Sequence, residues 1–195
     1  MNDYTAREFE VLRQTIQSRG GARPLVLLLG LSAWAGVLVV VLAWLPNPAA
    51  SVVPLVVLLA TFEVVRALHL GVERIGRYIQ VFFEEDSGGS APTGGPAWEH
   101  MAMHFGGSVP GAGVHPYFVA VFFIAVPVNF LAVLFPGPVL VELVALAVPH
   151  LAFLVWMLYC DRGMRRQRVA ELARFRELRA RTSRPGPPGP AAPSA

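Results

Sequence analysis

The chain has 195 residues, of which 54% are hydrophobic and 15% charged. A soluble globular domain has about 25% charged residues, so this composition excludes an ordinary soluble domain and indicates a membrane protein. The chain has no Lys, so its 16 basic residues are all Arg; against 13 acidic residues they give a formal net charge of +3. Most of these arginines flank hydrophobic runs. That placement favours orientation in a membrane over nucleic-acid binding, and a single cysteine, Cys160, excludes an intramolecular disulfide. The Arg-only usage with 18 Gly and 17 Pro is typical of a GC-rich bacterial genome.

The first two elements are a short amphipathic helix and a membrane span. Residues 1–22 carry both signs of charge and have capping-box spacing at Thr5 and Glu8, so they predict a helix that stops at Gly20-Gly21. Residues 24–45 are apolar and long enough to cross about 30 Å of hydrocarbon. We interpret them as transmembrane helix 1 rather than as a cleaved signal peptide.

Residues 51–85 form the most informative stretch. They begin as an apolar span and continue without a Pro or Gly-Gly break into a charged amphipathic helix, so we predict transmembrane helix 2 with a cytoplasmic extension. At about 100° per residue, one arc of this helix is polar. The arc contains Glu63, Arg66, His69, Glu73, Arg74, Arg77, Gln80 and Glu84.

The second half of the chain repeats the plan of a span, a Pro-rich turn and a span. Residues 86–115 are Gly- and Pro-rich and predict a loop with one short helix at 96–105. Residues 116–135 and 138–160 predict transmembrane helices 3 and 4, with Pro127 and Pro149 tolerated inside them. An Arg-rich helix at 161–184 and a disordered tail at 185–195 follow.

Charge placement predicts the orientation. The turns around residues 46–50 and 136–138 carry no charge, whereas the two terminal segments are rich in Arg. The positive-inside rule therefore predicts cytoplasmic N- and C-termini, a cytoplasmic middle loop and four spans in the bacterial inner membrane.

A buried polar cluster is the main candidate for chemistry. Glu63 and His150 each lie the same number of residues from an outer turn, so we expect Glu63, Arg66 and His150 to meet near the midplane, with Asn129 somewhat nearer the outer side. The cluster has three interpretations: helix–helix adhesion, which we favour, proton or ion handling, and catalysis. The candidate functional residues are Glu63, Arg66, His69, Glu73, Arg77 and His150.

Metal binding rests on weaker patterns. His69 and Glu73 share one helix face, and His100 and His104 have the spacing of zinc-binding helices. However, Met101 stands where a metalloprotease needs its glutamate. No cofactor is predicted, and a transition metal (zinc, iron or copper) belongs to the alternative interpretation.

Together these observations predict an all-α, four-transmembrane-helix bundle with cytoplasmic amphipathic helices at both termini. The predicted role is non-enzymatic: structural, assembly or partner-binding. Expected partners are anionic lipid headgroups and a second copy or another membrane protein, with no nucleic acid. The alternatives are a membrane-embedded metal-dependent enzyme that uses the polar arc, and an oligomeric channel or proton-coupled carrier.

Overall fold

The computed structural model describes residues 3–45, 47–85 and 117–182, and in these ranges the chain is almost entirely helical, without a strand. The three long helices are α1 (Asp3–Trp44), α2 (Val52–Ile79) and α5 (Leu140–Thr182), and α4 (Tyr117–Leu131) is shorter and apolar. Each long helix contains a segment long and apolar enough to cross a membrane. The predicted loop, its short helix and the tail at 185–195 lie outside the described residues.

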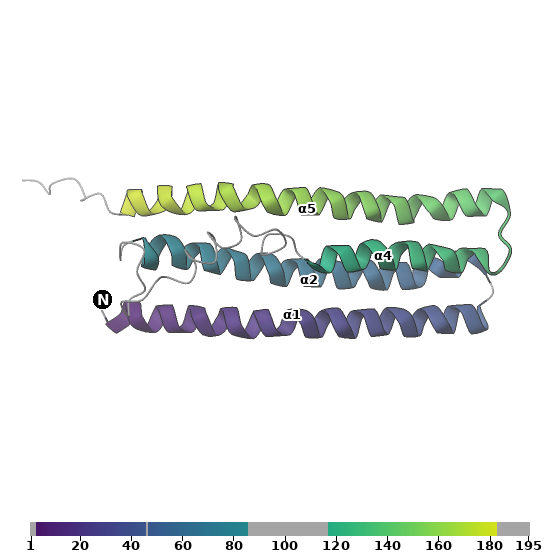
Figure 1. The fold of residues 1–195 in the computed structure, drawn as a ribbon, viewed down its shortest axis with the longest axis horizontal. Helices are drawn as coiled ribbons and strands as arrows, with labels where there is room; N and C mark the ends of the chain where they lie inside the picture. The colour runs from purple at the N-terminus through teal and green to yellow at the C-terminus, as the bar shows by residue number, and fades with distance from the viewer. Residues whose placement is uncertain (1–2, 46, 86–116, 183–195) are drawn as a thin grey trace, which may run out of the picture.

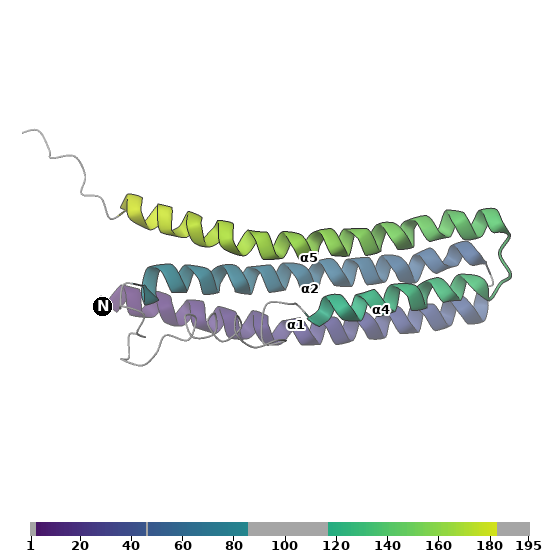
Figure 2. The ribbon, with the colours of Figure 1, turned by 45° about the horizontal axis from the view of Figure 1, so that its top comes forward.

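Helix α2 lies between α1 and α5, and α4 packs beside it on the half of the molecule where α1 ends and α5 begins (Figures 1 and 2). The beginning of α1 and the ends of α2 and α5 meet at the opposite end of the molecule (Figure 1). Because α4 covers only one half, the other half consists of three long helices that extend past it. We call this part the stalk; it comprises residues 3–22, 71–85 and 161–182.

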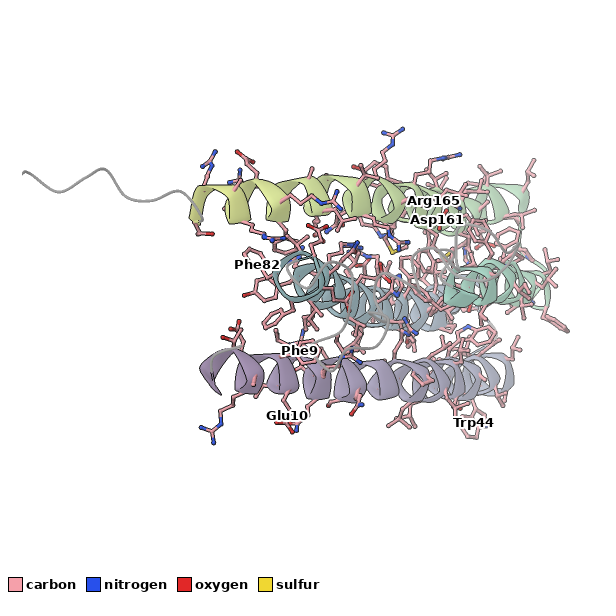
Figure 3. All side chains as sticks on the ribbon, turned by 60° about the vertical axis from the view of Figure 1, so that its left-hand side comes forward. Phe9, Glu10, Trp44, Phe82, Asp161 and Arg165 are labelled. Carbon is pink, nitrogen blue, oxygen red and sulfur yellow. The ribbon has the colours of Figure 1, made fainter. Side chains whose placement is uncertain are left out.

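The predicted break at Gly20-Gly21 is wrong, because α1 runs without interruption through both glycines and Pro24. Glycine costs about 1 kcal/mol in a helix relative to Ala, and Pro24 removes one backbone hydrogen bond. Packing on α2 offsets this cost: Tyr78 donates a hydrogen bond to Glu8 (3.0 Å), and the Phe9 and Phe83 rings lie 5.4 Å apart. Figure 3 places Phe9 on the side of α1 that faces α2.

Likewise, α5 is one helix over the predicted fourth span and the Arg-rich segment. Glu142 caps its beginning by accepting a hydrogen bond from the backbone N–H of Val139 (3.1 Å). The Arg-rich segment therefore continues along the axis of the span rather than turning onto a bilayer surface.

Two turns close the end of the molecule that contains α4. Asn47 caps the 3₁₀ helix η1 (Pro48–Ser51), which leads directly into α2, by accepting a hydrogen bond from the N–H of Ala49 (2.9 Å). A second 3₁₀ turn, η3 (Ala132–Leu134), follows α4. Gly137 then takes a φ of 70°, which side-chain-bearing residues rarely adopt, and so permits the sharp reversal into α5.

The end of α2 widens into a π-helical turn, η2 (Gln80–Glu84), in which the N–H of Glu85 donates to the carbonyl of Gln80 (3.0 Å). Arg179 of α5 donates to the Val81 carbonyl within this turn (2.8 Å). The π turn thus exposes a backbone acceptor that α5 uses.

The core lies where α2, α4 and α5 meet. Phe62 of α2 is fully buried, and its ring lies 5.4 Å from Phe122 and 6.1 Å from Phe118 of α4. On its other side, Phe153 of α5 lies 5.8 Å away. This aromatic centre positions the polar groups described next.

Candidate functional site

A polar boundary crosses the molecule at one level. Arg23 precedes the apolar run of α1, and its Nη1 lies 2.8 Å from Nδ1 of His69 on α2. The His69 ring in turn packs edge-to-face on Phe118 at the start of α4. The apolar parts of α1, α2 and α4 therefore begin together, and His69 lies at their edge.

Glu63 and Arg66 form an ion pair on the apolar side of this boundary. Arg66 Nε donates to Glu63 Oε2 (2.9 Å), and Trp156 of α5 donates its indole N–H to Glu63 Oε1 (2.6 Å). Both charged side chains are partly exposed, at 34% for Glu63 and 27% for Arg66. Glu63 lies about 9 Å and Arg66 about 4.5 Å along the helix from His69, so this pair lies between the boundary and the centre of a 30 Å apolar layer. The contact therefore joins α2 to α5 with no net charge.

His150 does not join this pair, contrary to the expected Glu63–Arg66–His150 cluster. It is buried and bonds instead to Asn129 of α4, whose Nδ2 lies 2.9 Å from His150 Nε2. The same Nδ2 donates to the backbone carbonyl of Ser51 (3.0 Å), while Oδ1 accepts from the indole N–H of Trp34 (3.0 Å). Asn129 thus connects α1, η1 and α5 through one side chain.

The hydrogen bonds of this network assign the state of His150. Because Asn129 Nδ2 can only donate, His150 Nε2 must accept, and the ring proton must lie on Nδ1. That proton has a partner, since Nδ1 lies 2.7 Å from the Leu146 carbonyl. His150 is therefore a neutral imidazole with both nitrogens satisfied, which is the arrangement of a structural histidine.

The depth prediction for His150 failed because α2 and α5 do not begin at the same level. Ser51, directly before α2, lies at the level of His150, which is well inside α5. Along a helix, Ser51 and Glu63 are about 18 Å apart. The neutral network that contains Ser51 and His150 therefore lies deeper in the apolar part than the Glu63–Arg66 pair.

A second set of ion pairs joins α2 to α5 in the stalk. The Arg77 side chain is only 4% exposed, and it bonds Glu73 of its own helix (2.9 Å) and Glu171 of α5. Arg74 adds a further bond to Glu171 (2.9 Å). Burial raises the pKa of the Glu171 carboxyl, but hydrogen bonds from Gln167 and Arg74 and the charges of Arg77 and Arg74 outweigh it, so the pKa lies below its usual value.

Further contacts close the end of the stalk. Arg176 donates to Glu85 (2.8 Å), and Tyr78 and Phe82 of α2 pack on Phe175 of α5 with ring centroids 5.8 and 6.4 Å apart. Figure 3 shows Phe82 at the end of α2 beside α5. The predicted polar arc of α2 is therefore divided between α1 and α5 rather than facing one cavity.

The described residues supply no further ligand for the predicted metal sites. Over residues 3–45, 47–85 and 117–182, no group of three or more His, Cys, Asp or Glu side chains could hold a metal ion. His69 and Glu73 lie there without a third ligand, whereas His100 and His104 lie outside the described residues. Beside η1 lies a cleft of about 270 Å³ whose polar residues, Asn47 and Ser51, already bond within the chain.

Sequence reasoning placed Asn129 beside the expected cluster but did not predict it as the centre of the network, and it missed Glu171 and Trp156 as partners of the polar arc. An Asn within an otherwise apolar span was a signal, because amides in membrane helices commonly bond to neighbouring helices. No sequence signal identified its partners, because Trp34, Ser51 and His150 come from three other segments.

The fold and these sites define a helical protein with three helices apolar enough to cross a membrane, joined by a neutral network in the apolar part and by ion pairs in the stalk. The chain matches no protein-family model, and neither a curated protein nor a solved structure is significantly similar to it. Its function is therefore inferred from the geometry alone.

Proposed function

We propose that this chain is a small, multi-pass bacterial inner-membrane protein with a non-enzymatic role: four spans hold a rigid cytoplasmic stalk that binds a partner. The observation that carries the proposal is the stalk, in which ion pairs to Glu171 and Glu85 and the aromatic contacts of Phe175 tie α2 to α5. Buried and half-buried polar side chains of the stalk, among them Arg77 and Glu171, are engaged in helix–helix contacts, as expected of a scaffold.

The charge distribution supports the orientation. Helix α4 and η3 together form an apolar helical segment that packs with the three long helices and serves as the fourth span. The connections at the α4 end carry no charge, while the Arg residues lie at the stalk end, which the positive-inside rule assigns to the cytoplasm.

Cysteine accessibility tests the topology. In a Cys160→Ser background, Ser18→Cys and Thr182→Cys should react with a membrane-impermeant maleimide only after the inner membrane is permeabilised. Ala49→Cys, on an exposed residue of η1, should react in intact spheroplasts. Labelling of residue 182 from outside would contradict the four-span orientation.

Site-specific photocrosslinking tests the partner-binding role. A photoreactive residue at Val11 or Val169, both exposed in the stalk, should give one discrete adduct in cells of the native host. The same probe at Val155, equally exposed but in the apolar segment, is the matched control and should give none. An adduct of twice the chain mass identifies a second copy as the partner, and no adduct from either stalk position contradicts the role.

A further inference from the structure

Along one face of α5 the side chains are first apolar, then a tyrosine, then arginines. This order complements the acyl chains, ester groups and phosphate of a phospholipid. Val148, Leu151 and Val155 are 59–64% exposed on this face within the apolar segment. Tyr159 follows at 67% exposure, and Arg162 and Arg166 come after it, both exposed. At about 100° per residue, Tyr159, Arg162 and Arg166 lie on one side of the helix.

The two arginines differ from the others nearby because the described residues offer them no partner. Arg165, between them, is held by Asp161 (2.7 Å), and Figure 3 shows that pair on α5. Within the part of the chain that the structure describes, Arg162 and Arg166 make no hydrogen bond or ion pair. Like charges at this i,i+4 spacing repel, and an anion between them would remove that repulsion.

Their level matches that of phosphate groups. The headgroup region adds about 5–7 Å on each side of a 30 Å apolar layer. Arg162 and Arg166 lie about 3 and 9 Å beyond Cys160, the last residue of the apolar run. Side chains on a helix lean toward its N-terminus, so both guanidinium groups lean back toward the membrane.

We infer that Tyr159, Arg162 and Arg166 form a binding site for one anionic phospholipid of the cytoplasmic leaflet. The two guanidinium groups hold its phosphate, the Tyr159 hydroxyl donates to the ester region, and the acyl chains lie on Val155 and Leu151. Guanidinium groups bind phosphate oxygens in pairs, which gives this site a preference for anionic headgroups. The inference rests on the proposed orientation, which the cysteine-labelling experiment tests separately.

Native mass spectrometry of the full-length protein, released from mild detergent with phosphatidylglycerol or phosphatidylethanolamine, tests the site. Each arginine near an anionic surface contributes about five-fold in affinity, so Arg162→Gln with Arg166→Gln should weaken phosphatidylglycerol binding by about 30-fold. Binding of zwitterionic phosphatidylethanolamine should not change. Far-UV circular dichroism checks that the variant keeps its helices.

The matched control is Arg174→Gln with Arg181→Gln, which removes the same charge from exposed positions more than about 20 Å beyond the apolar run. We expect it to retain phosphatidylglycerol. Equal loss in the control, or no loss in the Arg162/Arg166 variant, overturns the inference, as does equal binding of the two lipids by the unaltered protein.

Millimolar inorganic phosphate should not displace the lipid; displacement would assign the arginines to a free anion instead. If labelling supports the topology while any of these outcomes occurs, only the lipid site is rejected.

Discussion

At the scale of single residues, the structure separates two kinds of polar group in the apolar half. Glu63 and Arg66 are charged and mutually neutralised, and Arg66 lies about 4.5 Å along α2 from the polar boundary at His69, which a long Arg side chain can span to reach water. Asn129 and His150 are uncharged, buried and deeper in the apolar half. This division follows from the cost of charge in hydrocarbon, which is greatest at the midplane.

We expect Asn129→Leu to destabilise the protein by about 2 kcal/mol, because it leaves the Trp34 N–H, the Ser51 carbonyl and His150 Nε2 without partners. The measurement is unfolding in mixed micelles. His150→Phe in the same background completes a double-mutant cycle, and the two changes should cost less together than the sum of the separate losses. Strict additivity would contradict the network.

At the scale of elements, α1 approaches α2 closely at Gly30. A Cβ atom there would lie 2.1 Å from Cγ2 of Thr61, and the Thr61 hydroxyl is itself bonded to the Val57 carbonyl (2.7 Å). Glycine therefore permits the short distance between the two helices, as small residues do in membrane helix bundles.

Gly30→Ala should accordingly destabilise the α1–α2 contact by about 1–3 kcal/mol, seen as a lower melting temperature in detergent. Gly36→Ala is the matched control, since a Cβ at that position meets nothing within 4 Å. It should leave stability unchanged or raise it through helix propensity. Equal effects of the two substitutions would show that Gly30 is not a packing contact.

In the stalk, Glu171→Gln should weaken the docking of α5 on α2 by about 1–3 kcal/mol, because the buried Arg77 loses a charged partner. The control is Glu177→Gln, which alters only exposed pairs within α5, to Arg174 and Arg181. Spin labels on the two helices report the distance between them. A similar widening in both variants would argue against the Glu171 contact.

The same carboxylate predicts a pH dependence. The pKa of Glu171 is lower in the folded protein than in the unfolded chain, so its stabilising effect is present above the unfolded value of about 4.3. The effect is lost as the pH falls through the lowered folded pKa. The spin-label distance should therefore stay constant from neutral pH to about pH 5 and widen in stronger acid, and Glu171→Gln should remove that acid transition.

At the scale of the whole molecule, the long helices join an apolar half and a stalk. α1 and α5 are each continuous across the polar boundary, so each runs from the stalk into the apolar half as a single helix. The stalk contacts of α2 with α1 and α5 keep these axes together.

We also expect the purified protein to keep its helical content and melting temperature after treatment with a metal chelator, because its described contacts use hydrogen bonds, ion pairs and aromatic packing. Elemental analysis before treatment accompanies the measurement. A bound transition metal whose removal unfolds the protein would favour the metal-dependent enzyme, with His100 and His104 as the first candidates for mutation.

The sequence by itself determined the helical class, the apolar runs and the positions of the charged segments, because hydrophobicity and helical periodicity are local properties. It also identified the Glu63–Arg66 pair, whose members lie one turn apart on one helix. Local rules failed at Gly20-Gly21, where contacts with α2 outweigh a weak preference for ending the helix.

Only the tertiary structure decided which helix faces which, and at what height. The relative level of α2 and α5 depends on η1, on the Gly137 turn and on the fit of Phe62 among its aromatic neighbours, none of which is encoded in residue spacing. That offset moves His150 away from Glu63 and places it against Asn129. Glu63 bonds Trp156 instead, because contacts between distant segments are set by the packing of whole helices rather than by any single run of sequence.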